Sequence, residues 1–221
     1  MEEKTFSKRD FKASIYEMLK YAKPCISEKR IELFKGLLQR RRYDEVVAKM
    51  LGDMALKTRV GYKFVEDSYL LNELKKSGVS DEFMHVVASG LPFDRYREPA
   101  RIMVSDAVPL YGTDSFNKHI FRMEIGETMK YESAESFIAL LAHEFSHIFL
   151  YAIRHPLRES EVATDLCAIA LGYGDVIRIG RLLCSDSILG YLDSEQFKMA
   201  YRKLHQPTTI IGKARQLFSI I

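Results

Sequence analysis

The sequence predicts an α+β fold that is mostly helical, with a small sheet placed before a pair of antiparallel helices. Apolar residues recur at helical spacing through the first ninety residues and again beyond residue 133, whereas prolines, glycines and short alternating runs occupy residues 91–126. The chain has 221 residues, of which 47% are hydrophobic and 29% charged, the balance of a globular protein with a sizeable core. We therefore divide it into a helical region, residues 1–98, and a core region, residues 99–221.

The N-terminal region is predicted to be a series of helices. The first ends before Pro24, because a proline inside a helix removes a backbone donor and clashes with the preceding turn. Further helices are expected from Ser27 and over residues 44–56, 67–77 and 81–89. The last two are each followed by a glycine, the residue most often found just after a helix.

The core region begins with two short strands, expected at Ala100–Val104 and at His119–Ile125. A long helix is then expected over about residues 133–151, ending before the next proline. A second helix is expected over about residues 159–171, and a last one from Asp193. The second of these helices is predicted to return antiparallel to the first.

Residues 143–147 spell His-Glu-Phe-Ser-His. Side chains four residues apart lie on one face of a helix, so the imidazoles of His143 and His147 can bind one metal ion. Glu144 is rotated from His143 by about 100°, which leaves it free to act as a general base on water. The surrounding helix is strongly apolar, and unpaired buried polar groups cost several kcal/mol, so a metal ion would compensate these side chains. The alternative is two core histidines satisfied by backbone groups or carboxylates.

A zinc ion that keeps one position open needs a third protein ligand. Glu161 is the best candidate, because a short turn after the first helix brings the second helix back alongside it. Asp165, one helical turn further, is expected to accept a hydrogen bond from a ligand imidazole and so fix its tautomer. Alternatively, Glu161 is only a carboxylate that the helix dipole stabilises at a helix N-terminus, although Glu159 fits that role better.

The motif at His143–His147, followed by Glu161-Val-Ala-Thr-Asp165, resembles the signature of gluzincin-type zinc metallopeptidases. The short offset between the two motifs resembles the minimal core of soluble relatives of the CAAX prenyl protease/HtpX-like family and of ImmA/IrrE-type domains. The resemblance covers about residues 100–205. It departs in two respects, since the membrane-embedded members have transmembrane helices, and the ImmA-type second motif usually ends in Ala-Asn where this chain has Thr164-Asp165.

The resemblance implies peptide hydrolysis, with Zn²⁺ held by His143, His147 and Glu161 and with Glu144 as the general base. It also implies a tyrosine or histidine that stabilises the oxyanion. The candidates by location are Tyr173, Tyr191, Tyr201 and His205.

The charge distribution and the cysteines bear on partners and compartment. Residues 1–63 carry 16 Lys/Arg against 9 Asp/Glu, a net charge of +7, whereas residues 64–221 have a net charge of −4. A basic N-terminal region predicts an acidic partner or nucleic acid, or simply a solvated helix surface. The three cysteines (Cys25, Cys167 and Cys184) form no pair pattern and no secretory or membrane segment is evident, so a cytoplasmic protein with no membrane association is expected.

Two other functions stay open at this stage. One is a zinc-binding module, catalytically weak or inactive, that acts in protein or nucleic-acid recognition. The other is a DNA-associated regulator, although residues 1–98 show no convincing helix-turn-helix. The presence of Glu144 favours the peptidase, because a purely structural zinc site has no use for that carboxylate.

Overall fold

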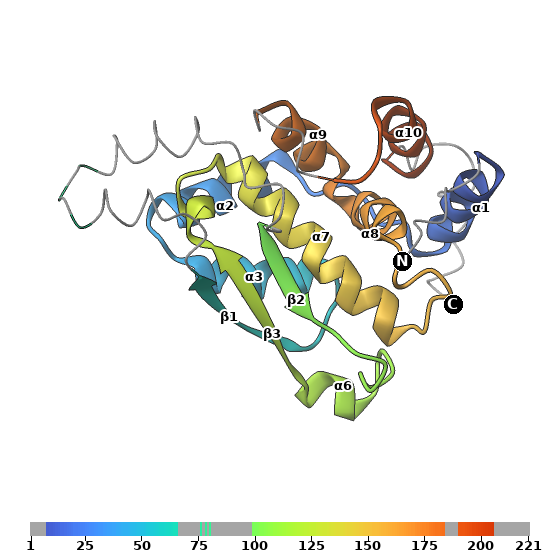
Figure 1. Ribbon diagram of the computed structural model, residues 1–221, viewed down its shortest axis with the longest axis horizontal. Helices are drawn as coiled ribbons and strands as arrows, with labels where there is room; N and C mark the ends of the chain where they lie inside the picture. Colours follow the sequence, from blue (N-terminus) through green and yellow to red (C-terminus); the bar gives the residue numbers. More distant parts are fainter. Residues whose placement is uncertain are drawn as a thin grey trace.

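The computed structural model describes residues 8–65, 76, 78, 80, 99–183 and 190–205, and it confirms the α+β class (Figure 1). The described helices are α1 (Lys8–Met18), α2 (Glu28–Gln39), α3 (Tyr43–Asp53), α6 (Asp114–Lys118), α7 (Ala134–Ala152), α8 (Glu161–Ala168), α9 (Gly174–Leu183) and α10 (Ser194–Ala200). Short 3-10 turns occupy Leu19–Tyr21 and Glu127–Lys130, and π-helical segments occupy Ile169–Tyr173 and Tyr201–His205. None of the helices in the described part of the chain combines the length and the apolar character that a membrane crossing requires.

One mixed sheet contains the described strands, in the order β1-β3-β2. The strands are β1 (Arg59–Val65), β2 (Ala100–Met103) and β3 (Ile120–Gly126). The central strand β3 is parallel to β1, with Ile120 opposite Arg59, and antiparallel to β2, with Ile125 opposite Ala100. The structure confirms the two predicted strands, whereas β1 was not predicted. Because β2 lies at an edge, one of its two sides remains available to groups outside the sheet.

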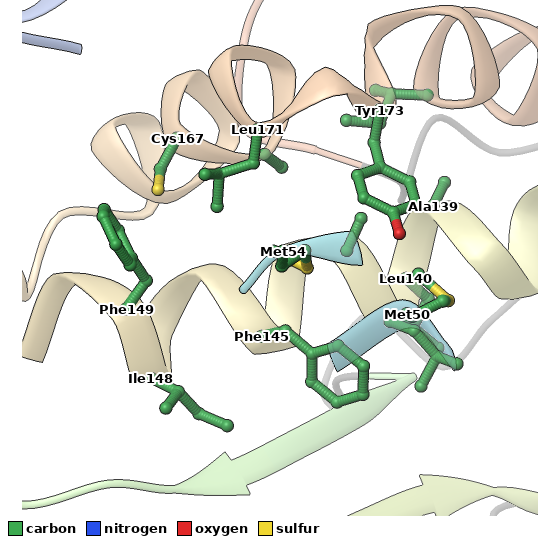
Figure 2. Close-up of a cluster of buried hydrophobic side chains, with 14 of the residues drawn as sticks. Met50, Met54, Ala139, Leu140, Phe145, Ile148, Phe149, Cys167, Leu171 and Tyr173 are labelled. Carbon is green, nitrogen blue, oxygen red and sulfur yellow. The ribbon is translucent and has the colours of Figure 1, made fainter. Parts of the chain in front are cut away.

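Helix α7 lies between the sheet and the pair α8 and α9 (Figure 1). The helix begins at Ser133, whose hydroxyl accepts a hydrogen bond from the N–H of Ser136. Figure 2 shows Phe145 and Ile148 of α7 pointing toward the sheet and Phe149 pointing toward α8. All three are buried, and burying a side chain of this size contributes about 1.5–3 kcal/mol. The helix that carries the histidine motif is thus fixed from both sides.

The N-terminal helices share this core. Met50 and Met54, at the end of α3, lie beside the α7 cluster together with Leu171 (Figure 2). Helix α2 packs on α7, helix α1 packs on α8, and β1 belongs to the sheet itself. The helices expected at residues 67–77 and 81–89, and a boundary after residue 98, fall almost entirely outside the described residues.

The helix expected over residues 159–171 does not end the helical run. After α8 the π-helical segment leads through Gly172, at φ +99°, directly into α9, which was not predicted. The N–H of Ile26 donates to the carbonyl oxygen of Gly172 at 3.1 Å, so the α1–α2 connection packs closely on this bend. A Cβ at Gly172 would lie 2.5 Å from the carbonyl oxygen of Pro24. Glycine therefore allows both the backbone conformation and the close approach.

Candidate metal centre

A short turn brings α8 back alongside α7. Arg154 adopts a left-handed conformation (φ +55°) just after α7, which reverses the chain. Ser160 is the N-cap of α8, and its hydroxyl accepts a hydrogen bond from the N–H of Ala163 at 3.3 Å. Glu161 is therefore the first helical residue, and its carboxylate faces the histidines of α7.

The structure brings together the three residues that the sequence predicts as metal ligands. Oε2 of Glu161 lies 3.0 Å from Nε2 of His143 and 3.3 Å from Nε2 of His147. One potential ligand atom from each of these residues lies within 4.8 Å of the other two. In a tetrahedral zinc site with bonds of about 2.0–2.1 Å, two ligand atoms lie about 3.3 Å apart. The two carboxylate–nitrogen distances match this spacing, and the three side chains could hold a metal ion.

Helix α8 also orients both imidazoles. Nδ1 of His143 lies 2.8 Å from Oδ1 of the buried Asp165, as the sequence predicts, which leaves Nε2 to face the site. Nδ1 of His147 lies 3.3 Å from the hydroxyl of Thr164, and that hydroxyl donates to the carbonyl oxygen of Ser160 at 3.1 Å. Since a hydroxyl has a single proton to donate, Thr164 accepts from Nδ1 of His147, which leaves Nε2 of His147 to face Glu161.

The Thr164 contact was missed at the sequence level, where Thr164 was only a departure from the Ala-Asn ending. Its position one residue before Asp165 was the available signal, because adjacent positions on α8 can reach the two different imidazoles.

Hydrogen bonds among His143, Glu161 and Asp165 shift the pKa of His143 and of Glu161. Burial alone would lower the pKa of His143, but its hydrogen bonds to Asp165 and Glu161 outweigh burial and raise the pKa to about 10. Burial would raise the pKa of Glu161, but hydrogen bonds from His143 and His147 lower it to about 2. Glu161 is therefore a carboxylate at any ordinary pH, in the ionisation state that a metal ligand needs.

Glu144 lies at the junction of α7 and the free side of β2. Its Oε2 accepts a hydrogen bond of 2.8 Å from the N–H of Ile102, and the side chain is buried. Burial raises the pKa of Glu144, while the nearby imidazoles of His143 and His147 oppose that rise. A carboxylate with a raised pKa, one residue away from a candidate ligand histidine, could act as a general base.

The pairing of β2 explains why Ile102 faces Glu144. Pro99 accepts from the N–H of Gly126 on the β3 side. Along an antiparallel strand, the backbone N–H and C=O groups of successive residues alternately face the paired strand and face away from it. Ala100 and Ile102 therefore direct their backbone groups to the free side, toward α7.

A cleft of about 260 Å³ joins these features. Its walls are formed by the free side of β2, the ligand face of α7, and the turn at residues 190–191. Helices α7 and α9 contribute the apolar side chains of Leu140 and Ile177 to its lining. The cleft is also lined by Glu144 and by the metal-ligand cluster, which consists of His143, His147 and Glu161. The candidate ligands and the candidate base thus open into one cavity.

Among the four candidates for oxyanion stabilisation, Tyr191 lies at the cleft. Its ring stacks on the ring of His143, with centroids 5.8 Å apart and an interplanar angle of 27°. The N–H groups of Tyr191 and Leu192 both donate to Oδ2 of Asp165, at 2.5 and 3.2 Å. The carboxylate that orients His143 therefore also holds the turn that carries Tyr191.

The other candidates lie elsewhere. Tyr173 is fully buried in the hydrophobic core (Figure 2). The hydroxyl of Tyr201 donates to Asp175 of α9, and Tyr201 lines a different cavity. The side chain of His205 lies outside the described residues.

No protein-family model, curated protein or solved structure with which the chain was compared matches it. The likeness to gluzincins thus depends on the motif residues alone, and the site has to be judged by its own geometry.

Proposed function

We propose that this protein is a zinc-dependent endopeptidase that hydrolyses a protein or peptide substrate. The observation that supports the proposal is the grouping of His143, His147 and Glu161 in one cleft, with Glu144 beside them. The scattered spacing of the three cysteines, and the absence of a disulfide among the described residues, support a reducing compartment, the cytoplasm.

The free side of β2 supports a peptide as the substrate. An extended peptide can add to a strand edge through main-chain hydrogen bonds, which recognise any sequence. Ala100 and Ile102 line the cleft, and the backbone carbonyl of Ile102 faces the free side of β2 because its N–H already donates to Glu144. A peptide bound along β2 would pass directly over the metal-ligand cluster.

A zinc ion held by His143, His147 and Glu161 would supply Lewis-acid chemistry, lowering the pKa of a water and polarising the scissile carbonyl. Glu144 would take the proton from the attacking water and pass it to the leaving nitrogen. The Ile102 N–H would keep the carboxylate of Glu144 at the cleft wall in the right orientation. The phenolic O–H of Tyr191 would donate a hydrogen bond to the oxyanion that develops on the substrate.

The test is the substitution Glu144→Gln, which keeps the size of the side chain but removes its basicity. We expect zinc content, measured by elemental analysis, to stay at the wild-type level, and cleavage of a denatured protein mixture to fall about 10²–10⁴-fold. Glu159→Gln is a matched control, because Glu159 is exposed just before α8, and it should retain full activity.

Equal turnover by the Glu144→Gln variant would refute the mechanism. Zinc binding by the wild-type protein without cleavage of any protein in the mixture would contradict the peptidase and favour the zinc-binding module.

A further inference from the structure

A second cavity lies between α9 and α10, with a volume of about 310 Å³. It is a different cavity from the metal cleft and shares none of that cleft's described lining residues. Small-molecule sites in proteins have volumes of about 300–1,000 Å³, so the cavity can accept a ligand of that kind. Its main lining residues are Arg178, Arg181, Phe197, Lys198, Tyr201 and Arg202.

The lining of this cavity is basic. It includes four cationic side chains and, among the described lining residues, no carboxylate. Asp175 and Glu195 lie close by and pair with Arg178 at 3.9 Å and with Lys198 at 3.0 Å, which leaves a local net charge of +2. The cavity therefore favours an anion, and arginine is the side chain best suited to phosphate oxygens.

Two contacts orient the guanidinium of Arg181 in the wall of the cavity. One of its nitrogens, Nη2, donates to the carbonyl oxygen of Leu192, and its guanidinium lies 5.1 Å from the centre of the Phe197 ring. The other terminal nitrogen, Nη1, is buried and has no hydrogen-bond partner within the described part of the chain. Nη1 points toward Gly190, away from the cavity, so Arg181 contributes its positive charge to the cavity wall rather than a free donor.

Two aromatic rings give the cavity an apolar wall. Phe197 and Tyr201 lie four residues apart along α10 and the segment after it, with ring centroids 5.9 Å apart and an interplanar angle of 31°. The hydroxyl of Tyr201 is held by Asp175, so its ring is fixed in place. Nucleotide bases stack on such rings.

We propose that this cavity binds a nucleotide, whose phosphates contact the arginines and whose base packs on Phe197 and Tyr201. The site does not require the zinc centre, and its lining residues take no part in the proposed peptidase chemistry. A bare phosphate would satisfy the charges but leave the aromatic wall uncovered, which is why a nucleotide fits better than an inorganic anion.

The experiment is calorimetric titration of the full chain with ADP, inorganic phosphate and adenosine at low salt. EDTA is present throughout, so that ADP cannot bind through a metal ion. We expect ADP to bind with a Kd below about 1 mM, with phosphate and adenosine each at least about tenfold weaker, because each offers only half of the contacts. The double substitution Arg178→Gln with Arg202→Gln should weaken ADP binding at least about tenfold. The single substitution Lys198→Gln, at an exposed position in the lining of the same cavity, is a second variant and should also weaken ADP binding.

The matched control is Arg59→Gln with Arg122→Gln. Both residues are exposed on the strands β1 and β3, so this variant loses the same charge away from the cavity, and it should bind ADP like the wild-type protein. Three results would overturn the proposal: no ADP binding, an equal loss of binding in the control variant, or phosphate binding as tightly as ADP. Because no zinc is present, a negative result for peptidase activity has no bearing on this test.

Discussion

The substitution Asp165→Asn tests the link between the metal-ligand cluster and the turn that carries Tyr191. One carboxylate oxygen of Asp165 faces Nδ1 of His143, and the other accepts from two backbone N–H groups. An asparagine has only one oxygen, so it can serve one of these two sides. If its amide nitrogen faces His143, the imidazole must carry its proton on Nε2, which is the tautomer that cannot bind zinc.

The expected loss of zinc affinity is about 10–100-fold, the usual effect of removing a carboxylate that orients a ligand histidine. That loss corresponds to about 1.4–2.7 kcal/mol. The free energy of unfolding of the metal-free protein should also fall by about 1.5–3 kcal/mol, since at least one hydrogen bond to a charged group is lost. Competition with a chromogenic chelator measures the first quantity, and urea denaturation measures the second.

Asp193→Asn is the control for this variant. Asp193 caps α10 close to the same turn, and asparagine caps helices about as well as aspartate, so zinc affinity should not change. Wild-type zinc affinity in the Asp165→Asn variant would refute the role of Asp165 and with it the orientation of His143.

Three further predictions follow from the site and the fold. Because the pKa of His143 is raised to about 10, its imidazole is protonated at neutral pH in the metal-free protein. Zinc binding should therefore release about one proton, which an indicator dye detects, and zinc affinity should rise with pH up to about 10. Gly172→Ala should lower the free energy of unfolding, measured in urea, by at least about 2 kcal/mol, because of the positive φ and the contact with a backbone oxygen. Gly52→Ala in α3, where no atom lies within 4 Å of the added Cβ, should raise the free energy of unfolding by about 0.5–1 kcal/mol. Tyr191→Phe should retain zinc but lower kcat about 10²–10³-fold; an unchanged kcat would remove Tyr191 from the mechanism.

Local patterns predicted the elements that depend on local physics. The helix starts near Ser27, Ser133 and Asp193 and the alternation in β3 are properties of neighbouring residues, and the structure confirms these elements. Strand β1 was missed although Val60, Tyr62 and Phe64 alternate with more exposed residues. Its pairing with β3 joins residues about sixty positions apart, and no short-range pattern reports such a partner.

In the candidate site, too, local features could be predicted from the sequence and long-range contacts could not. The spacing of His143 and His147 is fixed by the helix, so it could be predicted. The interaction of Glu144 with Ile102 spans 42 positions, and that of Asp165 with Tyr191 spans 26, so neither could be foreseen from motifs. For the same reason the sequence could not rank Tyr191 above the other oxyanion candidates.

The position of Ser160 decides whether the site assembles at all. Its side chain and carbonyl oxygen accept from residues of the first turn of α8, and this cap fixes the residue at which the helix starts. Glu161, Thr164 and Asp165 lie within little more than one turn of that start, and each contacts a defined atom of a histidine on α7. A shift of the start by one residue would rotate all three by about 100° and separate them from their partners. The register of one helix start thus sets the candidate third ligand and the orientation of both imidazoles together.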